Sequence, residues 1–163
     1  MAVVDEVLAA NEHYAANFTK GHLPMPPGRK FAVVACMDAR LDPARVLGLE
    51  EGDAHVIRNA GGRAVDALRS IAISQRLLGT EEVIVIHHTD CGMLTFDNAT
   101  LHQKLHDDLG ADATHIDFLP FSDLEQSVRE DVELIRESPL TPVGLAVRGF
   151  IYDVRTGRLQ EVV

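Results

Sequence analysis

The residues best suited to chemistry in this sequence are its two cysteines and the polar side chains beside them. Cys36 opens the sequence CMDAR, and Cys91 lies in the sequence HTDCG, three residues after His88. Two thiolates and one imidazole form a ligand set that suits zinc, and a catalytic zinc takes three protein ligands and leaves a fourth position for water. The sequence therefore predicts a zinc site formed by Cys36, His88 and Cys91. The alternative for each cysteine is a buried thiol without a ligand.

Asp38 and Arg40 follow Cys36 at a spacing of two residues, at which the side chains of an extended backbone point the same way. A neighbouring guanidinium keeps the Asp38 carboxyl ionised and can hold it in a forked hydrogen bond away from a metal. Held in this way, Asp38 can accept a hydrogen bond from metal-bound water or hydroxide. Released, it could become a fourth ligand and displace that water. The sequence leaves both states open.

A glycine-rich turn at residues 59–62 follows a short apolar segment and precedes a helical pattern. Backbone N–H groups at such a turn can bind an anion, so Ala60 and Gly61 are candidate substrate-binding residues. An ordinary tight turn is the alternative. The motifs typical of dinucleotide, nucleoside triphosphate and α/β-hydrolase sites are absent from the sequence. His87 should face the opposite side of its strand from His88, and we interpret it as a core or interface histidine.

Short apolar runs alternate along the chain with segments of helical periodicity. Strands are predicted at 30–36, 54–58, 82–87 and 143–147, and helices at 3–18, at 63–78, after residue 93 and after a Ser-x-x-Glu capping box at 122–125. Segments 150–154 and 159–163 flank a Thr-Gly turn and suggest a terminal hairpin or edge strand. Because the apolar runs are continuous, we expect a three-layer α/β fold, with a central mainly parallel β-sheet and helices on both faces.

Such a sheet binds its ligands beyond the carboxyl ends of the strands. Cys36 ends one predicted strand, and the His88–Cys91 motif follows another. If these strands are neighbours, the candidate ligands converge at one edge of the sheet.

The composition is that of one ordinary globular domain. The chain has 163 residues, of which 46% are hydrophobic and 25% charged, and its formal net charge is −10. We expect a single domain over residues 1–163, in which residues 1–28 form a helical arm ahead of the body. The acidic charge and the absence of tryptophan disfavour nucleic acid and anionic membranes as partners. Without a long apolar run or a secretory signal pattern, a cytoplasmic location with reduced thiols is expected.

These motifs together resemble those of the β-class carbonic anhydrases. The matching sequences are CMDAR at 36–40, RNAG at 58–61 and HTDCGM at 88–93, and the resemblance covers nearly the whole chain. It is closest to the short branch of the family. The resemblance implies reversible hydration of carbon dioxide to bicarbonate and a proton through zinc-bound hydroxide. It also implies zinc ligation by Cys36, His88 and Cys91, and a catalytic dyad of Asp38 and Arg40.

The same resemblance implies a homodimer or a dimer of dimers, in which the N-terminal helix packs on the partner subunit. The sequence departs from the family pattern at two positions. Ala39 stands where many members carry serine, and Pro27 stands where plant-type members place a glutamine. The second departure is consistent with the short branch.

Two other functions remain open. Some relatives of this fold hydrolyse carbon disulfide or carbonyl sulfide at the same kind of zinc site. A non-catalytic zinc- or bicarbonate-sensing module, with Asp38 permanently closing the site, is the more distant alternative.

Overall fold

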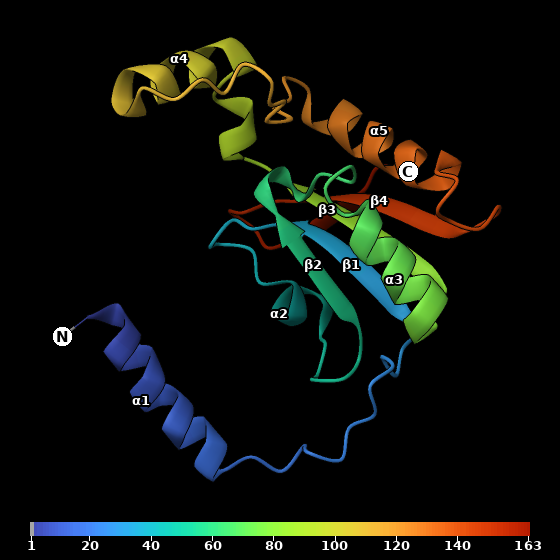
Figure 1. Cartoon of the computed structure of the whole chain (residues 1–163). Coiled ribbons are helices and arrows are strands. Elements are labelled where there is room, and N and C mark those ends of the chain that lie inside the picture. Colours follow the sequence, from blue (N-terminus) through green and yellow to red (C-terminus); the bar gives the residue numbers. More distant parts are fainter. Residues whose placement is uncertain (1) are drawn as a thin grey trace.

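A five-stranded sheet forms the centre of the computed structural model, which describes residues 2–163 (Figure 1). The strands are β1 (Phe31–Cys36), β2 (His55–Asn59), β3 (Glu82–His88), β4 (Ala146–Tyr152) and β5 (Leu159–Glu161). Their order is β2-β1-β3-β4-β5; the first four are parallel, and β5 is antiparallel to β4. The predicted α/β fold with a mainly parallel sheet is confirmed.

Helices lie on both faces of this sheet. The helices of the described residues are α1 (Val3–Ala16), α2 (Pro43–Leu47), α3 (Leu68–Leu78), α4 (Asn98–Leu109) and α5 (Leu124–Glu137), with 3₁₀ turns η1 (Ala60–Gly62) and η2 (Gly92–Leu94). Of these, α2, α3 and α5 pack on the sheet. Helices α3 and α5 pack on one face over an aliphatic core. The short α2 packs against a second core, on the other face, that includes both cysteines. Within residues 2–163, no helix combines the length and the apolar character needed to cross a bilayer.

The strand order creates a switch point between β1 and β3. The chain leaves β1 for β2 on one side and then crosses back to β3 on the other side. Because such crossovers are right-handed, the connecting helices α2 and α3 lie on opposite faces of the sheet. The segments that follow β1 and β3 therefore leave in different directions, and ligands of such sheets bind between them.

The C-terminal strands differ from the prediction. The strand predicted at 143–147 and the first strand of the hairpin, predicted at 150–154, are the single strand β4. The strand continues through Gly149. A Cβ there would stand 2.5 Å from Val128 Cγ1 and 2.8 Å from Val132 Cγ2. The glycine thus permits the close approach of α5 to the sheet. The predicted hairpin is present between β4 and β5.

The starts of α3 and α5 differ from the prediction, and α2 was not predicted. Helix α3 begins at Leu68, and the prediction began at residue 63. Asp123, and not Ser122, caps α5, and its carboxylate accepts a hydrogen bond from the Gln126 N–H. The periodicity did not predict α2, because five residues are too few to establish a period. Its cap is nevertheless visible in the sequence, since Asp42 and Pro43 are typical residues at a helix start.

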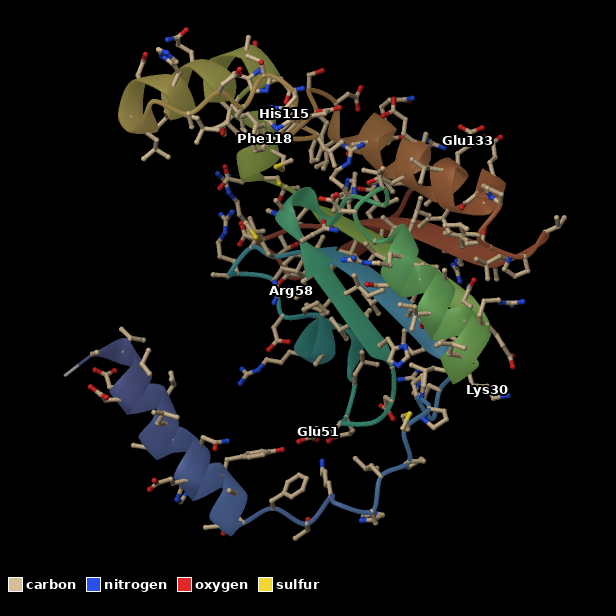
Figure 2. All side chains as sticks on the ribbon, viewed as in Figure 1. Lys30, Glu51, Arg58, His115, Phe118 and Glu133 are labelled. Carbon is tan, nitrogen blue, oxygen red and sulfur yellow. The ribbon has the colours of Figure 1, made fainter. Side chains whose placement is uncertain are left out.

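Helix α1 lies apart from the sheet and is joined to β1 by an extended segment (Figure 1). None of its residues is buried, and its apolar side chains are exposed, Leu8 by 59%. The arm is tied to the loop between α2 and β2 through Glu51. The Glu51 carboxylate accepts hydrogen bonds from the Tyr14 hydroxyl, at 3.3 Å, and from Lys20 (Figure 2).

Gly62 lets the η1 turn close on the two central strands. Its φ is +65°, and a Cβ there would stand 2.8 Å from the Cys36 nitrogen and 3.0 Å from the Ile86 oxygen. Because these are backbone atoms of β1 and β3, they cannot move aside. We predict that Gly62→Ala lowers the free energy of unfolding by about 3 kcal/mol or more, through a strained φ and overpacking.

Gly79→Ala is the matched control. Gly79 has a φ of +76°, but no heavy atom lies within 4 Å of a Cβ built there. This variant should lose only the backbone preference, about 1–2 kcal/mol. Urea unfolding followed by circular dichroism measures both losses, and equal losses would show that the close approach at Gly62 does not matter.

Candidate metal centre

The carboxyl ends of β1 and β3 bring the three predicted metal ligands together. Cys36 is the last residue of β1, His88 is the last residue of β3, and Cys91 lies in the turn that follows. Because β1 and β3 are adjacent and parallel, these residues meet at one edge of the sheet. Their sulfur and nitrogen ligand atoms lie within 4.8 Å of one another. Within residues 2–163, no other group of three His, Cys, Asp or Glu side chains converges in this way.

The buried His88 ring is oriented for metal binding. Its Nδ1–H donates a hydrogen bond of 2.8 Å to the Thr89 carbonyl, so the lone pair lies on Nε2. Nε2 is buried and has no hydrogen-bond partner. Leaving a buried polar atom unpaired costs free energy. A metal ion bound to this nitrogen and to the two sulfurs would remove that cost, and the donor set fits zinc.

The two thiols influence each other's ionisation. The Cys91 thiol is the main influence that lowers the pKa of Cys36, against the effect of burial. The neighbouring Cys36 raises the pKa of Cys91 well above its ordinary value. Burial lowers the pKa of His88, but the Cys36 sulfur beside it has the opposite effect, and the net shift is upward. A divalent cation must therefore displace protons to bind, so acid opposes binding.

Asp38 and Arg40 form the forked contact that their spacing allows. Asp38 Oδ1 accepts hydrogen bonds from the Arg40 backbone N–H at 2.8 Å and from Nε at 3.0 Å, and Oδ2 accepts one from Nη2 at 2.8 Å. The Arg40 side chain holds the pKa of Asp38 well below its usual range. Asp38 Oδ2 lies 3.7 Å from His88 Nε2, yet Asp38 is not part of the converging ligand group. Of the two states that the sequence leaves open, the structure contains the one in which Arg40 holds Asp38.

Asp90, to which the sequence motifs assign no role, binds the other edge of Arg40. Its Oδ2 accepts a hydrogen bond of 2.8 Å from Nη1, and its carbonyl oxygen accepts one of 2.9 Å from Nη2. Arg40 lowers the pKa of Asp90, and Asp38 and Asp90 together raise the pKa of Arg40. The one signal in the sequence was its place between the ligands His88 and Cys91.

Arg58 on β2 fixes the segment that carries the dyad. Its guanidinium donates hydrogen bonds to three backbone carbonyls, those of Cys36 at 2.9 Å, Asp38 at 2.8 Å and Leu41 at 2.6 Å. The family pattern includes this arginine, but nothing in the sequence indicated which groups it binds. One side chain thus shapes the segment after β1.

The η1 turn lies against the ligand-bearing end of β1, since Asn59 at the end of β2 pairs with Cys36. The backbone of Gly61 lowers the pKa of Cys36 and so favours a thiolate there. Anion binding by Ala60 and Gly61 stays a prediction.

His87 is a core histidine, in agreement with its interpretation from the sequence. Its side chain is fully buried. Its ring nitrogens lie 2.8 Å from Ser127 Oγ and 3.0 Å from Asp131 Oδ2, both on α5. It therefore faces the helix-covered core, away from the metal ligands.

Comparison with known proteins identifies the family. Residues 31–117 match the family described as carbonic anhydrase. The chain is 50% identical to β-carbonic anhydrase 1 of Mycobacterium tuberculosis, over 99% of each chain. It is 34% identical to a carbon disulfide hydrolase of Acidithiobacillus thiooxidans, over 83% of this chain and 78% of that relative. A crystal structure of a carbonic anhydrase from Streptococcus mutans matches with a TM-score of 0.95 at 50% identity, over 100% of this chain and 99% of that one. With half of its residues identical over the full length and the same fold, the chain belongs to the β-class of the carbonic anhydrase family.

Proposed function

We propose that the chain catalyses the reversible hydration of carbon dioxide to bicarbonate and a proton, at a zinc ion held by Cys36, His88 and Cys91. The observation that carries this proposal is the convergence of two thiols and one unpartnered imidazole nitrogen at the strand ends. When bound, zinc acts as a Lewis acid and lowers the pKa of a bound water toward about 7, which supplies a nucleophile near neutral pH.

Asp38 orients the attacking group in this proposal. Arg40 keeps its carboxylate ionised, and an ionised carboxylate can accept a further hydrogen bond. A hydroxyl group beside the three ligands can donate a hydrogen bond to Asp38. This hydrogen bond directs a lone pair of the hydroxyl oxygen at the carbon of carbon dioxide. Arg40 has the complementary role of holding Asp38 out of the ligand set.

The η1 turn is the proposed site for the negative charge that develops on bicarbonate. Backbone N–H groups fixed in position stabilise such charge without reorganisation. Ala60 and Gly61 carry the candidate N–H groups, in a turn that lies against the ligand-bearing end of β1.

Substitution of the proposed ligands should change the metal content of the protein. Cys91→Ser and His88→Ala should each remove one ligand, so most zinc should be lost on dialysis, together with nearly all activity. His106→Ala, which changes an exposed histidine on α4, is the control and should retain its zinc. Atomic absorption gives the zinc content, and circular dichroism verifies folding. Full zinc content in folded Cys91→Ser would refute the ligand assignment.

Stopped-flow measurement of carbon dioxide hydration by the zinc-loaded protein tests the function. The rate should rise between about pH 6.5 and about pH 9, as the activating ionisation is completed. Asp38→Asn should keep its zinc but lose about 100-fold or more in turnover, since the amide is a poorer acceptor. Asp108→Asn, which breaks an exposed pair with Lys104, is the matched control and should be unaffected.

An inactive zinc-loaded protein would contradict the proposal. Carbon disulfide is the second substrate for that experiment, because one relative is a carbon disulfide hydrolase. Turnover of carbon disulfide without hydration of carbon dioxide would favour the alternative function.

We further propose that residues 1–28 form an arm of the single domain over residues 1–163, and that this arm packs on a second copy to give a homodimer. Helix α1 has 14 residues, none of them buried. An isolated helix of this length is marginal in water without tertiary packing. Val4, Val7 and Leu8 share an exposed apolar stripe that a second copy would cover.

Leu8→Glu should therefore weaken self-association, because it places a charge on that stripe. His13→Glu is the matched control, since it lies about 140° around the helix from Leu8. Analytical ultracentrifugation measures the association of both variants at equal concentration. If Leu8→Glu associates like the wild type, or if the wild type is a monomer, the arm has another role.

The cytoplasm is the compartment that we propose for the chain. Both ligand cysteines must remain reduced to bind zinc, and a reducing compartment preserves thiols. Recovery of the chain from the secreted or periplasmic fraction of its cells would contradict this location.

A further inference from the structure

We propose that Asp90 is a positioning residue for the hydration reaction. By binding Arg40, it holds the Asp38–Arg40 dyad in the arrangement that keeps Asp38 out of the ligand set. The proposal rests on the function proposed above and assigns a role to a residue outside the ligands and the dyad.

The geometry of the guanidinium carries this inference. One edge of Arg40, formed by Nε and Nη2, binds both oxygens of Asp38. The other edge, formed by Nη1 and Nη2, binds the side chain of Asp90 at 2.8 Å and its carbonyl oxygen at 2.9 Å. Arg40 is therefore bound along two edges by two carboxylates, and only one of them belongs to the dyad.

Arg40 needs this second partner because little else restrains it. Its residue lies between β1 and α2, outside regular structure, and its side chain is 46% exposed. At such exposure, solvent screens the attraction between Arg40 and a single carboxylate. A planar guanidinium bound along both edges has fewer alternative orientations than one bound along a single edge. Asp90 thus favours the one orientation that engages both Asp38 oxygens.

The backbone of Asp90 places it for this contact. Its φ of +53° lies in the left-handed region, which aspartate tolerates better than most residues. It lies between His88 and Cys91, so the contact joins the ligand-bearing turn after β3 to the segment after β1. The position of the dyad is therefore coupled to the ligands themselves. Asp38 Oδ2 lies only 3.7 Å from His88 Nε2. Without the contact of Asp90 with Arg40, we expect Asp38 to move toward the ligand set.

Two substitutions in the zinc-loaded protein test the role. Asp90→Gly removes the carboxylate and suits the positive φ, and Asp90→Asn keeps an oxygen acceptor without the charge. The control is Glu81→Gln, which breaks the 3.0 Å pair with Lys30 beside the amino end of β3. We expect kcat to fall about fivefold in Asp90→Gly and less in Asp90→Asn, with unchanged KM and zinc content. Glu81→Gln should leave all three quantities unchanged.

The Arg40 Nε–H resonance gives a readout that does not depend on activity. It can be assigned in a ¹⁵N spectrum by its absence from Arg40→Lys. In Asp90→Gly this proton should exchange faster with water, because the guanidinium is less firmly held. Unchanged exchange together with unchanged kcat would overturn the proposal. Loss of zinc from Asp90→Gly would also overturn it, because Asp90 would then support the ligands and not the dyad.

The failure of this proposal is distinguishable from failure of the proposed function. If the wild-type protein hydrates no carbon dioxide, the function fails. Arg40 Nε–H exchange then still decides whether Asp90 positions Arg40.

Discussion

The pairing of β1 with β3 is the constraint on which the rest of this structure depends. Parallel pairing fixes the ends of both strands at one edge of the sheet, so Cys36 and His88 meet although they are far apart in the sequence. The tight turn after β3 then returns Cys91 to the same place. Gly62 belongs to this constraint, because its missing side chain lets η1 close over the backbone of both strands. The ligand geometry therefore comes from the buried central strands of the fold.

Burial of two thiols and an unpaired imidazole nitrogen costs free energy, and a bound metal ion would reduce that cost. The two thiols shift each other's pKa in opposite directions, and the buried His88 Nε2 has no hydrogen-bond partner. The neighbouring carboxylate of Asp38 would compete for the same cation. Arg40 removes that competition by binding both oxygens of Asp38, and it shares its remaining edge with Asp90. The arrangement keeps a carboxylate beside the metal ligands and prevents it from joining them.

The metal ligands could be predicted from the sequence, because cysteine and histidine are rare side chains and these ones lie at the predicted strand ends. It could not assign Asp90, whose partner Arg40 is distant in the sequence and whose contact depends on a left-handed backbone. Arg58 was equally hidden, since it binds backbone carbonyls, which every residue possesses. The sequence analysis divided β4 into two strands, and the close packing of α5 on Gly149 depends on tertiary contacts that the sequence does not show.

The central claim is that Cys36, His88 and Cys91 hold the zinc while Arg40 retains Asp38. The most direct test is a crystal structure of the zinc-loaded protein near neutral pH, with the metal identified by anomalous scattering at the zinc edge. The account predicts zinc bound to both sulfurs at about 2.3 Å and to His88 Nε2 at about 2.0 Å, with Asp38 bound to Arg40. Zinc at another site, or an Asp38 oxygen bound to it in place of Arg40, would contradict the account.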